Sequence, residues 1–332
     1  MASVVPLAIE VPLMRRDASC QSMGFLLNSQ EIRIVLTSET CYKSLPRTAN
    51  GEIESFSGWP KVQWINIDHH AASKPNRDWQ PPERLADDEC LYIEYSYAAK
   101  DGSVRGVTVS RRAALEHCRT LATVCRYAEG ETLICVSELK RETGLWHAVL
   151  TAVYTGLHVV FVPYAVLKVD PAVWLKQITR HKAAAAVVKS RDMHWALLAE
   201  KEHNSINLSC LRVLLVSDGS NPWSLNTCDN FVTAFRQRGL RSEALCPCAG
   251  SSETMTLSLR RPITGYGVED TLDTPGNPGE SLETGCASPG GRGVLSMHSL
   301  SYGLVRVDSE NSLTSLTLQD CGQILPGGIA TY

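Results

Sequence analysis

The sequence has little net charge of either sign. Its 32 lysines and arginines nearly balance 35 aspartates and glutamates, which gives a formal charge of -3 at pH 7. A protein that grips nucleic-acid phosphates normally carries a strongly basic face. The basic pairs, such as Arg111 and Arg112, are too short to form one. The composition therefore argues against nucleic acid as a direct partner.

Signals for export are also missing. No basic stretch followed by an apolar stretch opens the chain, and the 12 cysteines have no framework spacing. We expect a cytoplasmic protein with reduced thiols, with the nucleus as the alternative compartment. Residues 145–167 carry no charged side chain and are long enough to cross a bilayer. Because Gly156 and Pro163 interrupt them, we expect a helix followed by a buried strand and no membrane span.

Two common catalytic signatures are absent. The chain contains neither the Walker A pattern G-x-x-x-x-G-K-[ST] nor the nucleophile elbow G-x-S-x-G. Cys246 and Cys248 form a lone C-x-C pair, whereas a closed zinc site needs four ligands. His69 and His70 are adjacent, and adjacent side chains point apart in an extended segment. We expect no metal site from these residues.

The sequence does contain a regular alternation of apolar runs and amphipathic segments. Strands are predicted at residues 33–37, 62–67, 91–95, 132–136, 159–162, 184–188 and 212–216. Helices are predicted after Ser110, at residues 146–154, 171–181 and 192–199, and from residue 221 to about Gly239. Apolar strands alternating with helices are typical of parallel sheets covered on both faces. The fold class is therefore α/β.

The composition changes after Arg261. Residues 262–292 are rich in Gly, Pro, Thr, Glu and Ser, which predicts a disordered loop. Short β-rich pieces follow at residues 294–297, 303–307 and 313–318. We expect three parts: an α/β core over residues 1–261, the loop over 262–292, and a β-rich subdomain over 293–332.

A segment after Tyr95 resembles the phosphate loop of the acyl-activating (adenylate-forming) superfamily. That loop reads Thr-Ser-Gly-Ser-Thr-Gly-x-Pro-Lys-Gly after a strand that ends in Tyr. Ser96, Gly102 and Gly106 match it, and Arg105 stands where the family has lysine. Taken alone, the segment is better explained as an ordinary surface loop.

Three further landmarks of that superfamily follow in order. Residues 133–150 resemble its Leu-Pro-Leu-Tyr-His-Asp-Met-Gly-Leu segment at one Gly-Leu pair, without the histidine. Gly219 matches the glycine of the turn that lines adenine. Gly250 and Glu253 match the pattern Tyr-Gly-x-Ala-Glu, whereas Ala249 replaces the aromatic residue that stacks on adenine.

Longer strings, among them WPKVQWINID, KSRDMHWALLA and LRVLLVSDGSNPWS, resemble the first adenylation-like domain of the disco-interacting protein 2 family. The resemblance extends over residues 5–328. It implies the large amino-terminal lobe of an adenylate-forming protein, with partly parallel sheets flanked by helices and a small β subdomain. Relative to that family, we expect a chain shortened at both ends and without the small lobe that holds the catalytic lysine.

The resemblance also implies a chemistry. In that family a fatty carboxylate reacts with Mg-ATP to give acyl-adenylate and pyrophosphate, so ATP or AMP, Mg²⁺ and a fatty acid or acyl lipid are the implied ligands. The implied metal ligand is Glu253. The residues implied to bind the nucleotide are Ser96, Gly102, Arg105, Gly106, Gly219 and Gly250.

A second hypothesis belongs to another functional class. The changed phosphate loop, the lost histidine and Ala249 are compatible with a catalytically silent module that keeps the fold and binds a lipid, a nucleotide or a protein. For this shortened chain we expect no catalysis, and for the parent family we expect acyl activation. The sequence alone leaves the choice between enzyme and pseudoenzyme open.

Overall fold

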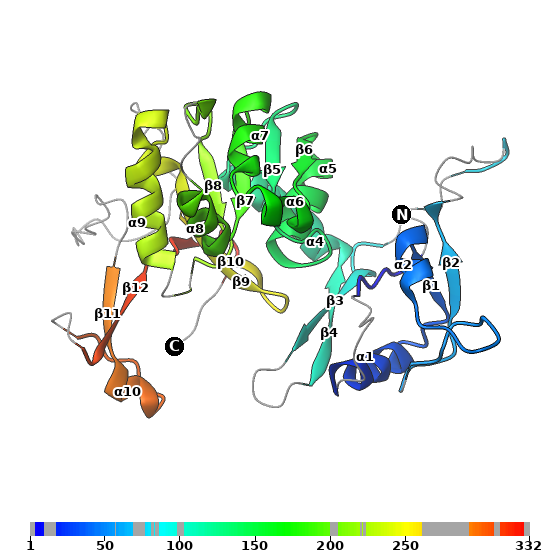
Figure 1. Cartoon of the computed structure of the whole chain (residues 1–332). Helices are drawn as coiled ribbons and strands as arrows, with labels where there is room; N and C mark the ends of the chain where they lie inside the picture. The colour runs from blue at the N-terminus through cyan, green and yellow to red at the C-terminus, as the bar shows by residue number, and fades with distance from the viewer. Residues whose placement is uncertain are drawn as a thin grey trace. The chain divides into compact units, whose positions relative to one another are not determined.

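The structure is a computed structural model, and its contacts divide the chain into residues 1–115 and 116–332 (Figure 1). We call these the amino-terminal unit and the carboxyl-terminal unit. Within the described residues, no helix is both long and apolar enough to cross a membrane. The structure describes residues 4–9, 18–56, 58–68, 77–80, 83, 86–97, 103–199, 205–219, 221, 224–260, 292–308 and 313–328.

The amino-terminal unit contains two small pairs of strands. Strands β1 and β2 are parallel, whereas β3 and β4 form an antiparallel hairpin. Met23, Leu26, Leu27 and Tyr95 form its buried cluster. The three strands predicted here are confirmed. The elements are α1 (Ala18–Ser29), β1 (Ile34–Thr37), α2 (Glu39–Ser44), β2 (Gln63–Asn66), β3 (Cys90–Tyr97) and β4 (Val104–Ser110).

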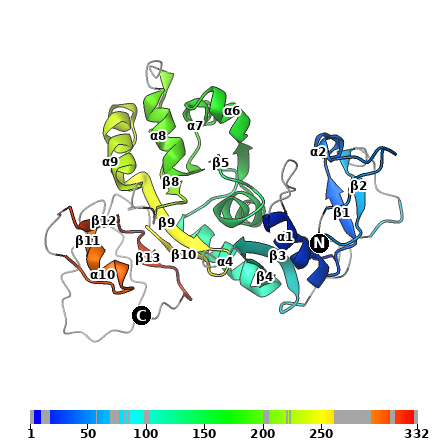
Figure 2. The same ribbon diagram turned by 60° about the horizontal axis from the view of Figure 1, so that its bottom comes forward.

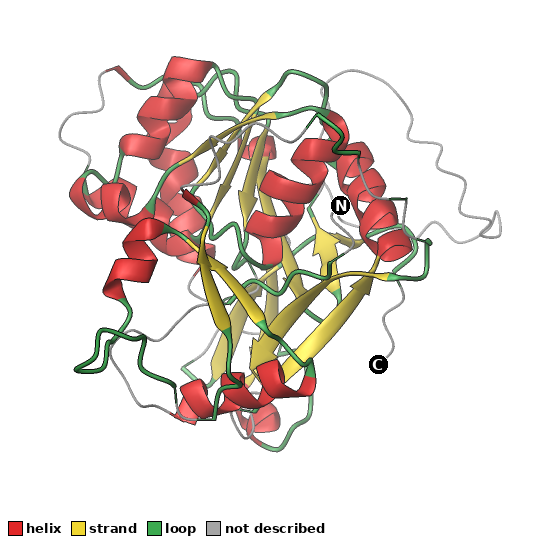
Figure 3. Ribbon diagram, turned by 90° about the vertical axis from the view of Figure 1, so that its right-hand side faces the viewer, coloured by secondary structure: helices red, strands yellow, loops and turns green. Residues whose placement is uncertain are grey.

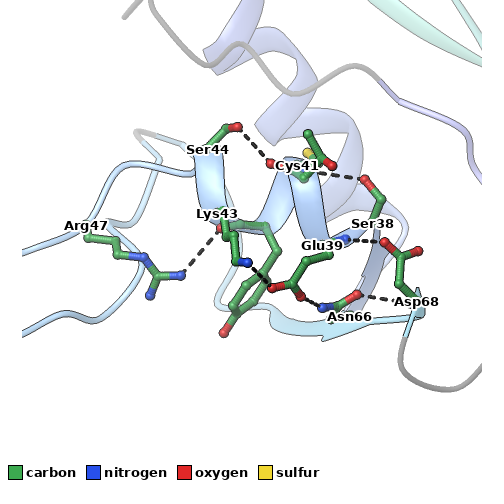
Figure 4. A network of polar contacts seen from close by, with 10 residues as sticks. Ser38, Glu39, Cys41, Lys43, Ser44, Arg47, Asn66 and Asp68 are labelled. Carbon is green, nitrogen blue, oxygen red and sulfur yellow. Dashed lines mark hydrogen bonds and ion pairs between the residues drawn. The ribbon is translucent and has the colours of Figure 1, made fainter.

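A polar network joins the ends of β1 and β2 to the short helix α2 (Figure 4). Ser38 caps the helix, because its hydroxyl accepts a hydrogen bond from the Cys41 amide at 3.3 Å. The Asp68 carboxylate accepts one from the Glu39 amide at 2.8 Å, and the Asn66 amide donates to the Glu39 carboxylate. The residues that follow both strands therefore anchor a helix of only six residues.

The segment after β3 differs from its prediction as a polar loop. Strand β4 begins at Val104 and runs back along β3. Val107 and Val109 alternate with Thr108 and Ser110, a β-branched pattern that favours a strand. The resemblance of this segment to the phosphate loop of the superfamily led to the prediction of a loop in place of this strand.

The carboxyl-terminal unit is built on one seven-stranded sheet of order β13-β10-β9-β8-β7-β5-β6 (Figure 2). Strands β9, β8, β7, β5 and β6 pair in parallel. Strand β10 pairs antiparallel with both of its neighbours, β9 and β13. The four strands predicted in this unit are confirmed, but the one after Gly156, predicted to be buried, is the edge strand β6, and none of its residues is buried. The strands are β5 (Thr132–Cys135), β6 (His158–Phe161), β7 (Ala185–Val188), β8 (Val213–Val216), β9 (Leu245–Ser251), β10 (Met255–Leu259), β11 (Arg292–Ser296), β12 (Ser315–Gln319) and β13 (Gln323–Ile324).

Helices connect these strands, and those predicted from the sequence are confirmed (Figure 3). Ser110 caps α4, since its hydroxyl accepts from the Ala113 amide at 3.2 Å. Gly156 ends α5 with φ of 76°, and β6 starts two residues later. The helices are α4 (Arg111–Val124), η1 (Gly144–Thr151, a π-helix), α5 (Ala152–Thr155), α6 (Tyr164–Val169), α7 (Val173–His181), α8 (Ser190–Leu198), α9 (Ser224–Phe235), η3 (Arg236–Arg238), η4 (Ser242–Ala244) and α10 (Met297–Ser301).

Side chains of successive residues in the parallel strands point to opposite faces of the sheet, and each face has its own hydrophobic core. Ile134 and Leu214 pack on one face with Trp174 of α7 and Phe231 of α9. Leu133 packs on the other face with residues of α4 and η1, including Leu121 and Trp146. Both faces are therefore covered, as the near-continuous apolar runs predict.

The β-rich end of the chain is only partly as predicted. Strands β11 and β12 form an antiparallel pair and correspond to two of the three predicted pieces. The third, residues 303–307, is not a strand; it follows α10, and only Val307 forms a bridge, with Leu295. Gly303 ends the helix with φ of 74°, and the chain turns there. Residues 261–291 lie outside the described residues, so the disordered loop stays a prediction.

Two histidines are buried between α4 and η1. His147 is fully buried and its Nδ1 lies 3.0 Å from the Tyr127 hydroxyl. The ring centroid of His117 lies 5.6 Å from that of Trp146. Burial lowers the pKa of His117 to about 4 and that of His147 to about 3, where the neighbouring His117 also contributes.

These lowered pKa values predict that acid destabilises the carboxyl-terminal unit. The unfolded chain binds protons near pH 6.5 and the folded chain does not, so stability is complete above pH 6.5 and falls as the pH drops toward 4. At pH 5 the loss should be on the order of 1–2 kcal/mol for each histidine. Urea unfolding at pH 7.5 and pH 5 measures it.

The variant His147→Asn cannot protonate and should lose part of this pH dependence. His194→Asn, on the exposed side of α8, is the matched control and should retain all of it. Equal pH dependence in the chain and in His147→Asn would contradict the assignment.

Candidate functional site

Polar residues follow three neighbouring strands of the sheet at the point where each strand ends. Ser137 lies just after β5, Lys189 directly after β7, and Ser217 directly after β8. Because these strands are parallel, their carboxyl ends share one edge of the sheet. In open α/β sheets this edge is where ligands bind. We call it the carboxyl edge.

The turn after β8 is fastened to the start of α8. One carboxylate oxygen of Asp218 accepts a hydrogen bond from the Ser190 amide, and the other accepts one from the Ser190 hydroxyl, both at 2.7 Å. The Ser217 amide also donates to the Val188 carbonyl at 2.9 Å. These contacts join residues 28 or 29 positions apart and fix the position of the turn that carries Gly219.

Gly219 lies in a tightly packed turn. A Cβ atom at this position would lie 2.6 Å from the Pro247 Cβ and 2.9 Å from the Cys248 amide nitrogen. The Ser224 hydroxyl, at the start of α9, donates to the Gly219 carbonyl at 3.0 Å. The backbone therefore passes directly against β9, and only glycine fits without a shift.

Gly250 and Glu253 belong to the hairpin between β9 and β10. Gly250 pairs with Thr256, and a Cβ at Gly250 would lie 2.2 Å from the Met255 carbonyl oxygen. Glu253 is exposed in the turn, and Ala249 is half-buried on β9. Gly219, Gly250 and Glu253 thus lie on β8 and its neighbour β9, or on the turns directly after them.

The predicted phosphate residues lie on the other unit. Ser96 on β3 pairs with Arg105 on β4, and Gly106 pairs with Tyr95. Arg105 is exposed, whereas Gly106 packs against α1, where a Cβ would lie 2.9 Å from a Leu26 methyl group. Ser96, Arg105 and Gly106 are therefore adjacent. Gly102 lies outside the described residues.

The sequence-based assignment did not include several residues of the carboxyl edge. Ser137, Lys189, Ser190 and Asp218 lie in segments that resemble the family, but none of the four was assigned a role. A usable signal was present, because each follows a predicted parallel strand directly or within two residues, and those strands end at one edge.

The other candidate metal ligands that the structure describes do not lie together in a closed site. Within the described ranges, no group of three or more His, Cys, Asp or Glu residues could hold a metal ion. Cys246 and Cys248 are buried on β9, and burial raises the pKa of both thiols. His69 and His70 lie outside the described residues.

Comparison with known proteins identifies relatives of the chain. A family model described as AMP-binding enzyme matches residues 4–284. Disco-interacting protein 2 of Drosophila melanogaster is 53% identical over 325 residues, which cover 97% of this chain and 17% of that protein. Disco-interacting protein 2 homolog B of Homo sapiens is 46% identical over 329 residues, with 99% and 20% covered. The chain thus spans about a fifth of these relatives' length.

Solved structures agree on the fold. A fatty acyl-adenylate ligase from L. pneumophila, in complex with acyl adenylate and pyrophosphate, superimposes with a TM-score of 0.70 at 18% identity. The match covers 96% of this chain and 50% of that chain. The predicted fold, the large lobe of adenylate-forming proteins, is confirmed.

The contacts between Asp218 and Ser190 predict a measurable contribution to stability. Asp218→Ala removes both hydrogen bonds and should cost about 1–3 kcal/mol, and Ser190→Ala removes one and should cost about 1 kcal/mol. Because the two residues interact, the double variant should lose less than the sum. Thermal unfolding measures these effects, with Asp229→Ala on the exposed face of α9 as control. Additive losses would contradict the pairing.

Close packing predicts that Gly219→Ala is poorly tolerated. Its Cβ would overlap Pro247 and the Cys248 amide, so we expect a loss of about 1–3 kcal/mol in the free energy of unfolding. Gly293→Ala is the matched control, since a Cβ there meets no atom within 4 Å. Denaturant unfolding of both variants tests the packing, and equal stability would show that the turn relaxes.

Proposed function

The chain belongs to the AMP-binding enzyme family, and from that premise we propose that its carboxyl edge binds the nucleotide of an adenylate-forming reaction. One observation carries the proposal. The turn at Gly219 and the hairpin with Gly250 and Glu253 are held side by side at the carboxyl edge by β8 and β9. These are the positions that the family resemblance assigns to adenine and to the metal.

The reaction we propose for the parent protein is acyl activation. A carboxylate oxygen of a fatty acid forms a bond to the α-phosphorus of ATP, the bond from that phosphorus to the bridging oxygen breaks, and pyrophosphate leaves. The products are acyl-adenylate and pyrophosphate, the two ligands named for the L. pneumophila ligase. Because the relatives are about five times longer, this activity is proposed for the whole protein.

The residues present fit parts of this chemistry. Glu253 offers an exposed carboxylate on a hairpin turn, and oxygen ligands of this kind suit Mg²⁺. When bound, the ion would neutralise phosphate charge. The residues proposed to bind phosphate lie in the amino-terminal unit: Ser96, Arg105 and Gly106. The exposed guanidinium of Arg105 supplies several hydrogen-bond donors.

A specific residue favours the second candidate function, a catalytically silent binding module. Ala249 stands where the family has an aromatic residue that stacks on adenine, and its methyl group offers no ring. Close packing alone also explains why Gly219 and Gly250 are glycines, without any bound ligand. Under this candidate the fold is retained and the bound molecule is not adenylated.

Isothermal titration of the chain with ATP in the presence of MgCl₂ tests the nucleotide assignment. Glu253→Gln removes a carboxylate beside the proposed nucleotide, so we expect roughly tenfold weaker binding. Glu243→Gln is the matched control: Glu243 is an exposed acid just before β9, whereas Glu253 follows that strand. Binding that is unchanged by Glu253→Gln would overturn the metal assignment.

Pyrophosphate release by the full-length parent protein, measured with ATP and a fatty acid, separates the two candidates. Release that depends on the fatty acid supports acyl activation. Saturable ATP binding without any release supports the silent module. Absence of ATP binding by the folded chain would contradict the proposed nucleotide site.

A further inference from the structure

Two histidines meet at the end of the sheet that lies opposite the carboxyl edge. His158 is the first residue of β6, and His181 is the last residue of α7, close to where β7 begins. Their ring centroids lie 5.9 Å apart, and their ring planes are inclined by 60°. His158 is exposed and His181 is half-buried, so ions from solvent can reach the pair. Neither residue has a part in the proposed nucleotide site.

Thr132, the first residue of β5, lies between the two segments that carry these histidines. It is the register partner of His158 in the parallel pairing of β5 with β6. Its carbonyl accepts a hydrogen bond at 3.1 Å from the amide of Ala184, which lies three residues after His181. The backbone of one strand therefore holds the start of β6 and the end of α7 side by side.

The side chain of Thr132 also orients one of the two imidazoles. Its Oγ1 lies 3.4 Å from Nδ1 of His158. Outer contacts of this kind fix the orientation of an imidazole ring and determine which nitrogen can bind a metal. Because Nδ1 faces Thr132, Nε2 is the atom of His158 that can bind an ion.

A pair of imidazoles favours divalent transition metals. Neutral imidazole suits zinc, copper and nickel, whereas magnesium and calcium prefer carboxylate and carbonyl oxygens. Metal–nitrogen bonds of about 2.0–2.1 Å place two nitrogens roughly 3.3 Å apart at a tetrahedral angle. Since the two ring centroids are already 5.9 Å apart, rotations of the side chains bring both rings onto one ion.

The surroundings of the pair carry charges of both signs. Arg180 and Lys182 flank the second histidine in the chain, and the side chain of Glu129 lies against Gly156, just before the first. The carboxyl end of α7 adds a partial negative charge that favours a cation. Among the residues that the structure describes, no group of three His, Cys, Asp or Glu side chains could hold a metal ion. The pair therefore supplies two ligands, and water supplies the others.

We propose that His158 and His181 bind one divalent transition-metal ion. The bound ion joins β6 to the end of α7. Strand β6 is the edge strand of the sheet, and none of its residues is buried, so it gains a second attachment from the ion. A ligand that binds the folded chain and not the unfolded chain stabilises the fold. The site is independent of ATP and of the carboxyl edge.

Titration calorimetry of the 332-residue chain with NiCl₂ at pH 7.5, without ATP, tests the proposal. Nickel is the probe because it favours imidazole, and MgCl₂ is the matched cation that does not. We expect saturable binding of Ni²⁺ and none of Mg²⁺. His158→Asn and His181→Asn should each weaken nickel binding roughly tenfold or more, because loss of even an outer partner of a ligand commonly costs that much.

The controls are His194→Asn and His298→Asn, which remove single exposed histidines on α8 and α10 and should leave nickel binding unchanged. All four variants keep every cysteine, so any binding by thiols is common to them. Nickel should also raise the thermal unfolding midpoint of the chain and of His194→Asn, but not that of His158→Asn.

Modification by diethyl pyrocarbonate, mapped by mass spectrometry, locates the ion in the unaltered chain. Nickel should protect His158 and His181 and leave His194 and His298 reactive. Thermal unfolding without metal shows which variants are folded, and where one is not, the protection pattern decides. The proposal would be overturned by absence of saturable nickel binding, or by less than a twofold change in both folded variants of the pair. Equal protection of all four histidines would show adventitious binding only and would also overturn it.

Discussion

Parallel pairing of β5, β7, β8 and β9 is the constraint on which the rest of the carboxyl-terminal unit depends. The register aligns Val187 with Leu215 and Cys135, so the strands end together and the polar residues that follow them meet at one edge. Apolar side chains on both faces maintain this alignment, because a slip in register would expose them. The positions of the Gly219 turn and of the hairpin with Glu253 both follow from it.

The proposed nucleotide site at this edge is held in place by close packing and by hydrogen bonds. The nucleotide positions are held by close packing, since Gly219 and Gly250 lie against Pro247 and Met255 with no room for a side chain. The hydrogen bonds between Asp218 and Ser190 fix the turn at Gly219 to the start of α8.

Much of this architecture could be predicted from the sequence. Continuous apolar runs predicted β5, β7 and β8, and Gly156 and Gly239 correctly indicated helix ends. Strand β4 was missed because its residues were matched to a loop of a related family. The pairing of Asp218 with Ser190 could not be predicted, because it joins residues 28 positions apart that meet only once the sheet is formed. Residues 303–307 have strand composition but follow a helix, so local pattern alone misleads there.

The central claim is that the carboxyl edge of this sheet binds the nucleotide, and hydrogen exchange with and without Mg-ATP tests it most directly. The account predicts slower exchange with Mg-ATP at residues 217–219 and 249–254, where β8 and β9 end. Residues 182–184, at the opposite end of β7, should exchange at the same rate in both conditions. Protection confined to that opposite end, or equal exchange throughout under saturating Mg-ATP, would contradict the account.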